Sequence, residues 1–180
     1  EVLANVFQRP EHDVNQVNRH LKTINAIVEA SDIYLMDATG LTVAASNWDT
    51  ARPFVGRNFS FRPYFQEAMQ GQLGRYYALG TTSQERGYYF AYPIRRNGET
   101  LGAVVVKISL DVIENTWGDG ENEFIVTDPD GVIFITTRPE WKFNTLKALP
   151  KERIAHIKAS RRYGDADLPS LPVVTQRAFA

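Results

Sequence analysis

Two cationic side chains stand where a folded domain rarely places a charge without a partner. Arg62 lies between the aromatic residues Phe61 and Tyr64, near the predicted start of a short helix. Its guanidinium can hold a carboxylate through two parallel hydrogen bonds, and a helix start adds positive potential. The simpler interpretation, an ordinary surface salt bridge, stays open at this point.

Lys107 is the second cation, near the end of the predicted strand 101–108. The strand is apolar on both faces, which is typical of strands that are buried on both sides. Lys107 shares the face of Val105. A buried lysine is costly unless it pairs with an anion. The alternative is that it lies at the strand end and extends its ammonium to water.

Three hydroxyls and one phenol are candidates to complete an anion site. Thr81, Thr82 and Ser83 close a predicted strand and open a turn, where hydroxyls and backbone N–H groups are suitable carboxylate donors. A plain polar loop fits each of them equally well. Tyr64 can cover the pocket or donate its hydroxyl, although a lone aromatic on a short helix is more often core. Two cations with several hydroxyls, and no acidic partner in the motif, suit a small dianion.

The elements that position these residues follow from hydrophobic periodicity and turn signals. Apolar residues at helical spacing predict a helix over 13–31, with Asp13 as its N-cap. A turn at 37–40 and the pair Asn97-Gly98 predict two hairpins. The predicted elements are strands 33–37 and 41–46, helix 61–70, strands 74–80, 87–95 and 101–108, and helix 110–117.

A repeat begins after this segment. Residues 124–135 have the same layout as residues 34–44: an apolar strand, an Asp-x-x-Gly turn and a second apolar strand. Helices over 143–149 and 151–161 and a loop over 163–172 are expected to follow, and equivalents of the three long strands are missing. The predicted fold is α/β of the α+β type, a long N-terminal helix with tandem antiparallel sheets of which the second is incomplete. The expected domains are residues 1–117 and 118–180.

Composition narrows the function classes. The 180 residues contain 20 Lys and Arg against 21 Asp and Glu, which argues against nucleic acid as a partner. The chain has no cysteine, which fits an oxidising compartment. Its apolar runs are far shorter than the about 20 residues of a membrane span.

No constellation of catalytic or metal-binding residues is evident. The three histidines, His12, His20 and His156, have no metal-ligand spacing, and the turn 128–131 lacks the remaining ligands of a calcium loop. Phosphate-loop and nucleophile-elbow motifs are missing as well. We therefore expect no cofactor, no metal and no enzyme activity in this chain.

The run Arg62-Pro63-Tyr64-Phe65 resembles the Arg-x-Tyr-Phe signature of Cache domains, the PAS-like extracytoplasmic sensors. A narrower likeness, to the sensor regions of C4-dicarboxylate sensor histidine kinases, covers most of the chain and rests on residues 34–37, 45–48, 55–59, 78–83 and 86–90. The resemblance implies a periplasmic region with a membrane-distal ligand pocket and a homodimer through the N-terminal helix. It also implies anchoring in the inner membrane and a cytoplasmic kinase outside this chain. Amino-acid-binding members hold the ammonium with an acidic residue, and the comparable positions here are Thr82 and Lys107.

The functional hypothesis is a sensor of succinate, fumarate or malate. Arg62 and Thr81 would hold one carboxylate, and Lys107 with Thr82 or Ser83 the other. Three alternatives remain: the Cache sensor of a chemoreceptor or other signalling protein that binds another small carboxylate, a periplasmic enzyme acting on small acids, and a dimerisation domain without a ligand.

Overall fold

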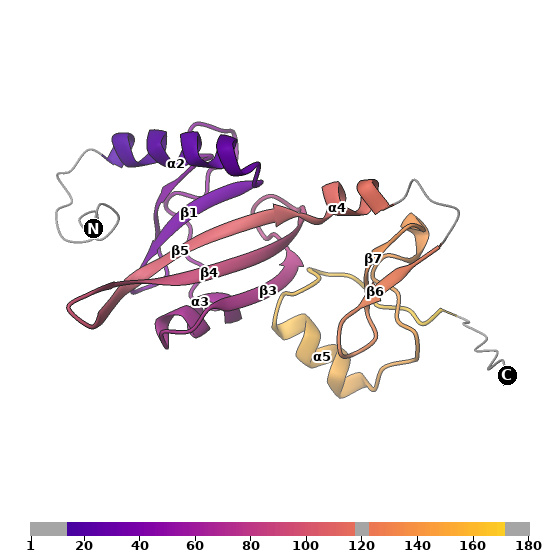
Figure 1. The fold of residues 1–180 in the computed structure, drawn as a ribbon. Helices are drawn as coiled ribbons and strands as arrows, with labels where there is room; N and C mark the ends of the chain where they lie inside the picture. Colours follow the sequence, from indigo (N-terminus) through magenta and orange to yellow (C-terminus); the bar gives the residue numbers. More distant parts are fainter. Residues whose placement is uncertain (1–13, 118–122, 172–180) are drawn as a thin grey trace, which may run out of the picture. The chain divides into compact units, whose positions relative to one another are not determined.

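The computed structural model describes residues 14–117 and 123–171, drawn in colour in Figure 1. The chain divides into two compact units, residues 1–109 and 110–180. The boundary predicted from the sequence lies after residue 117. In the structure, helix α4 (Leu110–Trp117) belongs to the second unit. The described helices include none that is long and apolar enough to cross a membrane.

The first unit is built on one antiparallel sheet. Its five strands run in the order β2-β1-β5-β4-β3, and each neighbouring pair is antiparallel. The predicted elements are confirmed with small differences at their ends. They are α2 (Val14–Val28), β1 (Asp32–Asp37), β2 (Thr42–Ala45), α3 (Pro63–Met69), β3 (Gly74–Leu79), β4 (Arg86–Arg96) and β5 (Glu99–Ser109).

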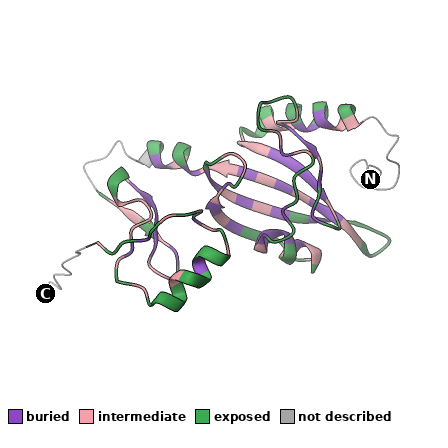
Figure 2. Ribbon diagram, turned by 180° about the vertical axis from the view of Figure 1, so that it is seen from behind, coloured by how far each residue is buried: buried purple, intermediate pink, exposed green. Residues whose placement is uncertain are grey.

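Alternation along the strands gives the sheet two buried faces. On one face Ile33, Leu35 and Ala44 pack with Leu21 of α2. On the other face Tyr34, Met36 and the intervening rows of β3, β4 and β5 pack under α3 and the segment 46–62. Figure 2 shows the strands largely buried and the outer side of α2 exposed. The helix is therefore amphipathic and covers β1 and β2.

Two contacts fix the helices on the sheet. The side chain of Asn18 is buried in α2 and accepts a hydrogen bond of 2.9 Å from the backbone N–H of Ala45. Helix α3 lies so close to β3 that a Cβ at Gly74 would stand 2.0 Å from the carbonyl oxygen of Tyr64. The predicted N-cap of α2, Asp13, lies outside the described residues.

The second unit contains a two-stranded sheet, β6 (Ile125–Thr127) with β7 (Ile133–Thr136), a short 3₁₀ helix η1 (Pro139–Trp141) and α5 (Lys151–Ala159). The β6–β7 turn repeats the β1–β2 turn in detail. Asp128 accepts from the backbone N–H groups two and four residues onward, as Asp37 does, and a glycine with φ near +80° follows in each turn. The sequence repeat is thus also a repeat of geometry.

The predicted helix over 143–149 is wrong. Residues 143–146 instead run beside β7, where the backbone of Ile133 exchanges hydrogen bonds of 2.8 Å with Phe143 and Asn144. Phe143 also has φ = 61°, outside the helical region. Pairing with a strand distant in sequence therefore overrides the local helical pattern. The predicted helix at 151–161 is confirmed as α5, although it ends at Ala159.

Candidate ligand pocket

A small pocket lies on the sheet face that α3 covers. Its free space is about 10 Å³, close to the minimum that one water molecule needs. Any larger molecule therefore enters only if lining groups move. The lining combines aromatic rings with one cation and two hydroxyls: Tyr34, Phe54, Phe59, Arg62, Tyr64, Gly80, Thr81, Thr82 and Tyr89.

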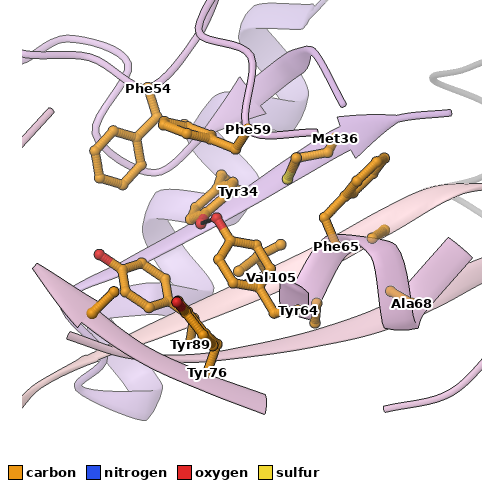
Figure 3. Packing of buried hydrophobic residues seen from close by; sticks show 14 residues of the cluster. Tyr34, Met36, Phe54, Phe59, Tyr64, Phe65, Ala68, Tyr76, Tyr89 and Val105 are labelled. Atoms are coloured by element: carbon orange, nitrogen blue, oxygen red, sulfur yellow. Dashed lines mark hydrogen bonds between the residues drawn. The ribbon is translucent and has the colours of Figure 1, made fainter. Parts of the chain in front are cut away.

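Three buried tyrosines, Tyr34, Tyr64 and Tyr89, line the pocket, and Figure 3 shows them packed among the other core residues. The hydroxyls of Tyr34 and Tyr64 point toward one another and share a hydrogen bond of 2.8 Å. The ring of Tyr64 stacks on that of Tyr89 with centroids 5.2 Å apart. Burial raises the pKa of Tyr64 to about 12, and it also raises the pKa values of Tyr34 and Tyr89. The phenols are therefore neutral at physiological pH and able to donate hydrogen bonds.

Arg62 occupies the N-cap position of α3 and is 2% exposed. One of its terminal nitrogens donates to the carbonyl oxygen of Leu79 at 3.1 Å, and its guanidinium lies 5.0 Å from the centroid of the Phe61 ring. The alternative of an ordinary surface salt bridge is wrong, because the side chain is buried at the pocket wall. The hydrogen bond to Leu79 ties the start of α3 to the end of β3.

Lys107 is fully buried, so the alternative in which it extends to water is also wrong. Its ammonium donates to Ser83 Oγ at 3.1 Å and forms ion pairs with Asp32 Oδ2 at 3.4 Å and Glu85 Oε2 at 2.8 Å. Burial raises the pKa of Asp32, although the nearby ammonium acts in the opposite direction. The expectation of no acidic partner is corrected, since two carboxylates contact this lysine.

The strand register places Lys107 beside the pocket. Asp32 on β1 and Tyr89 on β4 both lie directly opposite it, and cross-strand partners share a face. Its ammonium is 5.9 Å from the ring centroid of Phe54, which lines the pocket. Gly87 makes room for the lysine, because a Cβ there would lie 3.1 Å from Lys107 Cε.

The structure brings the predicted residues to one region in two groups. Arg62, Tyr64, Thr81 and Thr82 line the pocket itself, and Tyr64 is at the same time part of the core. Ser83 and Lys107 bond to each other beside it. Within residues 14–117 and 123–171, no cluster of three or more His, Asp or Glu side chains could hold a metal ion.

Sequence reasoning missed four polar side chains of this region, namely Asp32, Tyr34, Glu85 and Tyr89. A signal for Asp32 exists in the sequence, because it precedes the apolar run of β1 and could be paired in register with β5. Glu85 carries no comparable signal, since it lies in a polar turn. With the phenols and hydroxyls as donors and two cations at its sides, the pocket can bind an anion with two separated negative groups.

The Cache domain family model matches residues 1–167. The chain belongs to the Cache domain family. This confirms the family resemblance and the predicted fold class. The Cache domain is also similar to two curated proteins called C4-dicarboxylate transport sensor protein DctB. It is 40% identical to the one from Pseudomonas aeruginosa over 164 residues and 38% identical to the one from Rhizobium meliloti over 164 residues.

These alignments cover 90% and 91% of this Cache domain but 27% and 26% of the relatives, so the chain spans about a quarter of their length. Among solved structures, the sensor domain of the V. cholerae histidine kinase DctB aligns with a TM-score of 0.89 and 39% identity. The alignment covers 94% of this chain and 66% of that one. A Campylobacter jejuni chemoreceptor ligand-binding domain, in complex with 4-methylisoleucine, aligns with a TM-score of 0.63 and 17% identity over 86% of this chain and 62% of that one. It shares the fold.

Proposed function

We propose that this chain is the periplasmic sensor region of a membrane-anchored histidine kinase and that its first unit binds C4-dicarboxylates. The observation that carries the proposal is the pair of buried cations, Arg62 and Lys107, on one sheet face around a pocket of hydroxyls. A guanidinium and an ammonium near one pocket can each bind one carboxylate of a diacid. The names of the similar proteins support the same ligand class.

Each end of the ligand has its own set of groups. Arg62 and Thr81 hold one carboxylate, since a guanidinium offers two parallel donors. Lys107, with Thr82 or Ser83, holds the other carboxylate. Tyr64 covers the pocket, and its neutral hydroxyl can donate to the ligand.

Signalling follows from the narrowness of the pocket. Because the free space is about 10 Å³, a diacid binds a form in which lining groups have moved, and binding shifts the population toward that form. The first unit, residues 1–109, serves as the membrane-distal domain, and the second unit, residues 110–180, begins the domain that passes the change to a membrane helix. A homodimer through α2 is part of the proposal, supported by Ile27 and Val28, whose exposed fractions are 74% and 54%.

Calorimetric titration with succinate, fumarate and malate tests the ligand class, with acetate as the monoacid comparison. Lys107→Met keeps the buried stem and removes the charge, so its affinity for the diacids should fall by about 2 kcal/mol or more, at least thirtyfold. Arg62→Lys removes the two-donor fork and should weaken binding about tenfold. Lys158→Met, at an exposed lysine of the second unit, is the matched control. Failure of the wild-type chain to bind any diacid would overturn the proposal.

An amino-acid sensor is the second candidate, favoured by Asp32. Its carboxylate is 13% exposed and lies beside the pocket, where it could receive an ammonium group. Lys107 neutralises it in the structure, which favours the diacid. A further titration with glutamate tests this candidate, and tighter binding of glutamate than of succinate would favour the amino-acid sensor. Turnover of a bound acid would indicate an enzyme, and a chain that binds none of these acids would fit a dimerisation domain.

A further inference from the structure

The ammonium of Lys107 has no unused donor. A lysine offers three N–H groups, and they meet Asp32, Ser83 and Glu85 at 3.4, 3.1 and 2.8 Å. A ligand carboxylate that binds this lysine must therefore replace one of the three partners. Which partner leaves is decided by how firmly each is held.

Asp32 and Glu85 differ in how firmly they are held. Asp32 belongs to β1 and pairs directly opposite Lys107, with 13% of its side chain exposed. Glu85 precedes β4 in a turn, and 61% of its side chain is exposed. Water can take over the solvation of Glu85 at little cost, whereas a displaced Asp32 would stay in the protein interior. Glu85 is thus the partner that leaves most easily.

The turn that carries Glu85 also carries the pocket wall. Its carbonyl oxygen accepts from the N–H of Gly80 at 2.8 Å, and its N–H donates to Ser83 Oγ at 3.3 Å. Thr81 and Thr82, between these residues, line the pocket. Within this turn, the backbone of Gln84 is in the left-handed region, with φ = 60°. Release of the Glu85 carboxylate would therefore remove one of the two side-chain contacts that join this turn to Lys107, the other being that of Ser83.

We propose that Glu85 is an internal competitor for the ligand. Its carboxylate takes the place on Lys107 that the second carboxylate of a diacid needs, and diacid binding displaces it and frees the turn 80–85. The inference rests on the proposed function, because it assigns the regulation of that same site. Glu85 then lowers the affinity for diacids and links occupation of the pocket to a movement of the chain.

The test is calorimetric titration of Glu85→Gln with succinate. Removing the charge weakens the pairing with Lys107, so the dissociation constant should fall roughly three- to tenfold. Glu99→Gln, at an exposed glutamate in the β4–β5 hairpin, is the matched control and should change affinity less than about 1.5-fold. A second variant, Glu85→Asp, keeps the charge on a shorter side chain. Its dissociation constant for succinate should lie between those of the wild type and Glu85→Gln.

Hydrogen exchange supplies a second measurement that does not depend on affinity. In the wild type, succinate should speed hydrogen exchange of the backbone amides at 84 and 85, because the turn loses the contact between the Glu85 carboxylate and Lys107. Glu85→Gln should show the faster exchange without succinate.

The outcomes separate the two proposals. If the wild type binds succinate and Lys107→Met does not, but Glu85→Gln binds equally or more weakly, the competitor is overturned while the proposed function stands. Weaker binding would make Glu85 part of the ligand site. If neither the wild type nor Glu85→Gln binds a diacid, both proposals fail.

Discussion

Phenol groups set the chemistry of the pocket at the residue scale. Tyr34, Tyr64 and Tyr89 are all at most 5% exposed, so little water reaches their side chains. Loss of a proton would leave a phenolate with poor solvation, which is why burial raises their pKa values. The pocket thus keeps neutral donors over the whole physiological range, and its positive charge comes from the two cations alone.

The same burial predicts a stability that depends on alkaline pH. The three folded-state pKa values lie above the unfolded value of 10.0, and that of Tyr64 is about 12. The contribution of these tyrosines to the free energy of unfolding is therefore fully present below pH 10.0 and is lost as the pH rises above 10.0. Between pH 10.0 and about 12 the free energy of unfolding should fall by about 1.4 kcal/mol per pH unit for each tyrosine.

Urea unfolding at pH 8, 10 and 11 measures this slope. The double variant Tyr34→Phe/Tyr64→Phe removes two titrating groups and should leave about one third of the slope. Tyr92→Phe is the control, because Tyr92 is 62% exposed. An equal slope in the wild type and the double variant would show that other groups govern alkaline unfolding.

The residue scale also shows what a sequence can predict of the site. Arg62 and Lys107 are predictable, since a cation inside an apolar or aromatic run needs a partner whatever the fold. Their actual partners are not, because Asp32 reaches Lys107 through pairing across 75 positions and Glu85 through the shape of a turn. A sequence pattern therefore identifies a buried cation more readily than it identifies the carboxylates that pair with that cation.

At the scale of elements, the close approach of α3 to β3 shapes the pocket wall. A Cβ at Gly74 would stand 2.0 Å from the Tyr64 carbonyl oxygen and 2.7 Å from its Cα, both backbone atoms that cannot rotate away. Helix α3 carries Arg62 at its N-cap and Tyr64 in its first turn. Glycine at 74 is therefore what lets the helix bring both side chains to the pocket.

Gly74→Ala should destabilise the first unit by about 1–3 kcal/mol, since overpacking forces the backbone to shift. It should also weaken diacid binding, because α3 moves away from the sheet. Arg75→Ala, at the exposed next position, is the control and should stay within about 0.5 kcal/mol of the wild type. Urea unfolding and titration with succinate check both effects. A variant as stable as the wild type would contradict the close packing.

Element prediction succeeded where local signals and tertiary pairing agree. The turns at 37–40 and 97–98 contain glycines with φ of +83° and +84°, so the residues that a turn requires also mark it in the sequence. The segment 143–149 failed for the opposite reason: its pattern suits a helix, but its backbone bonds instead to Ile133 of β7. Such competition is decided by contacts far apart in the chain, which periodicity does not contain.

At the scale of the whole molecule, the two units have separate cores. The first has a core on each side of its sheet. The second gathers a smaller set of buried side chains around a two-stranded sheet: Val132, Ile133, Phe134, Ile135, Ile157, Tyr163 and Leu168. A sheet of two strands depends on what packs against it. The second unit is therefore expected to be the less stable one, and under the proposed function the diacid binds in the first.

Thermal unfolding should then show two transitions, of which succinate moves only one. At about 100 times its dissociation constant, a ligand stabilises the unit that binds it by about 2.7 kcal/mol, or roughly 10 °C for a unit of this size. Trp48→Phe leaves Trp117 and Trp141, both in the second unit, as the fluorescent groups. Circular dichroism of this variant should show the ligand-shifted transition, and its tryptophan fluorescence the unshifted one. If succinate raised the midpoint of the fluorescence transition equally, the two units would unfold together. Ligand binding in the first unit would then also stabilise the second.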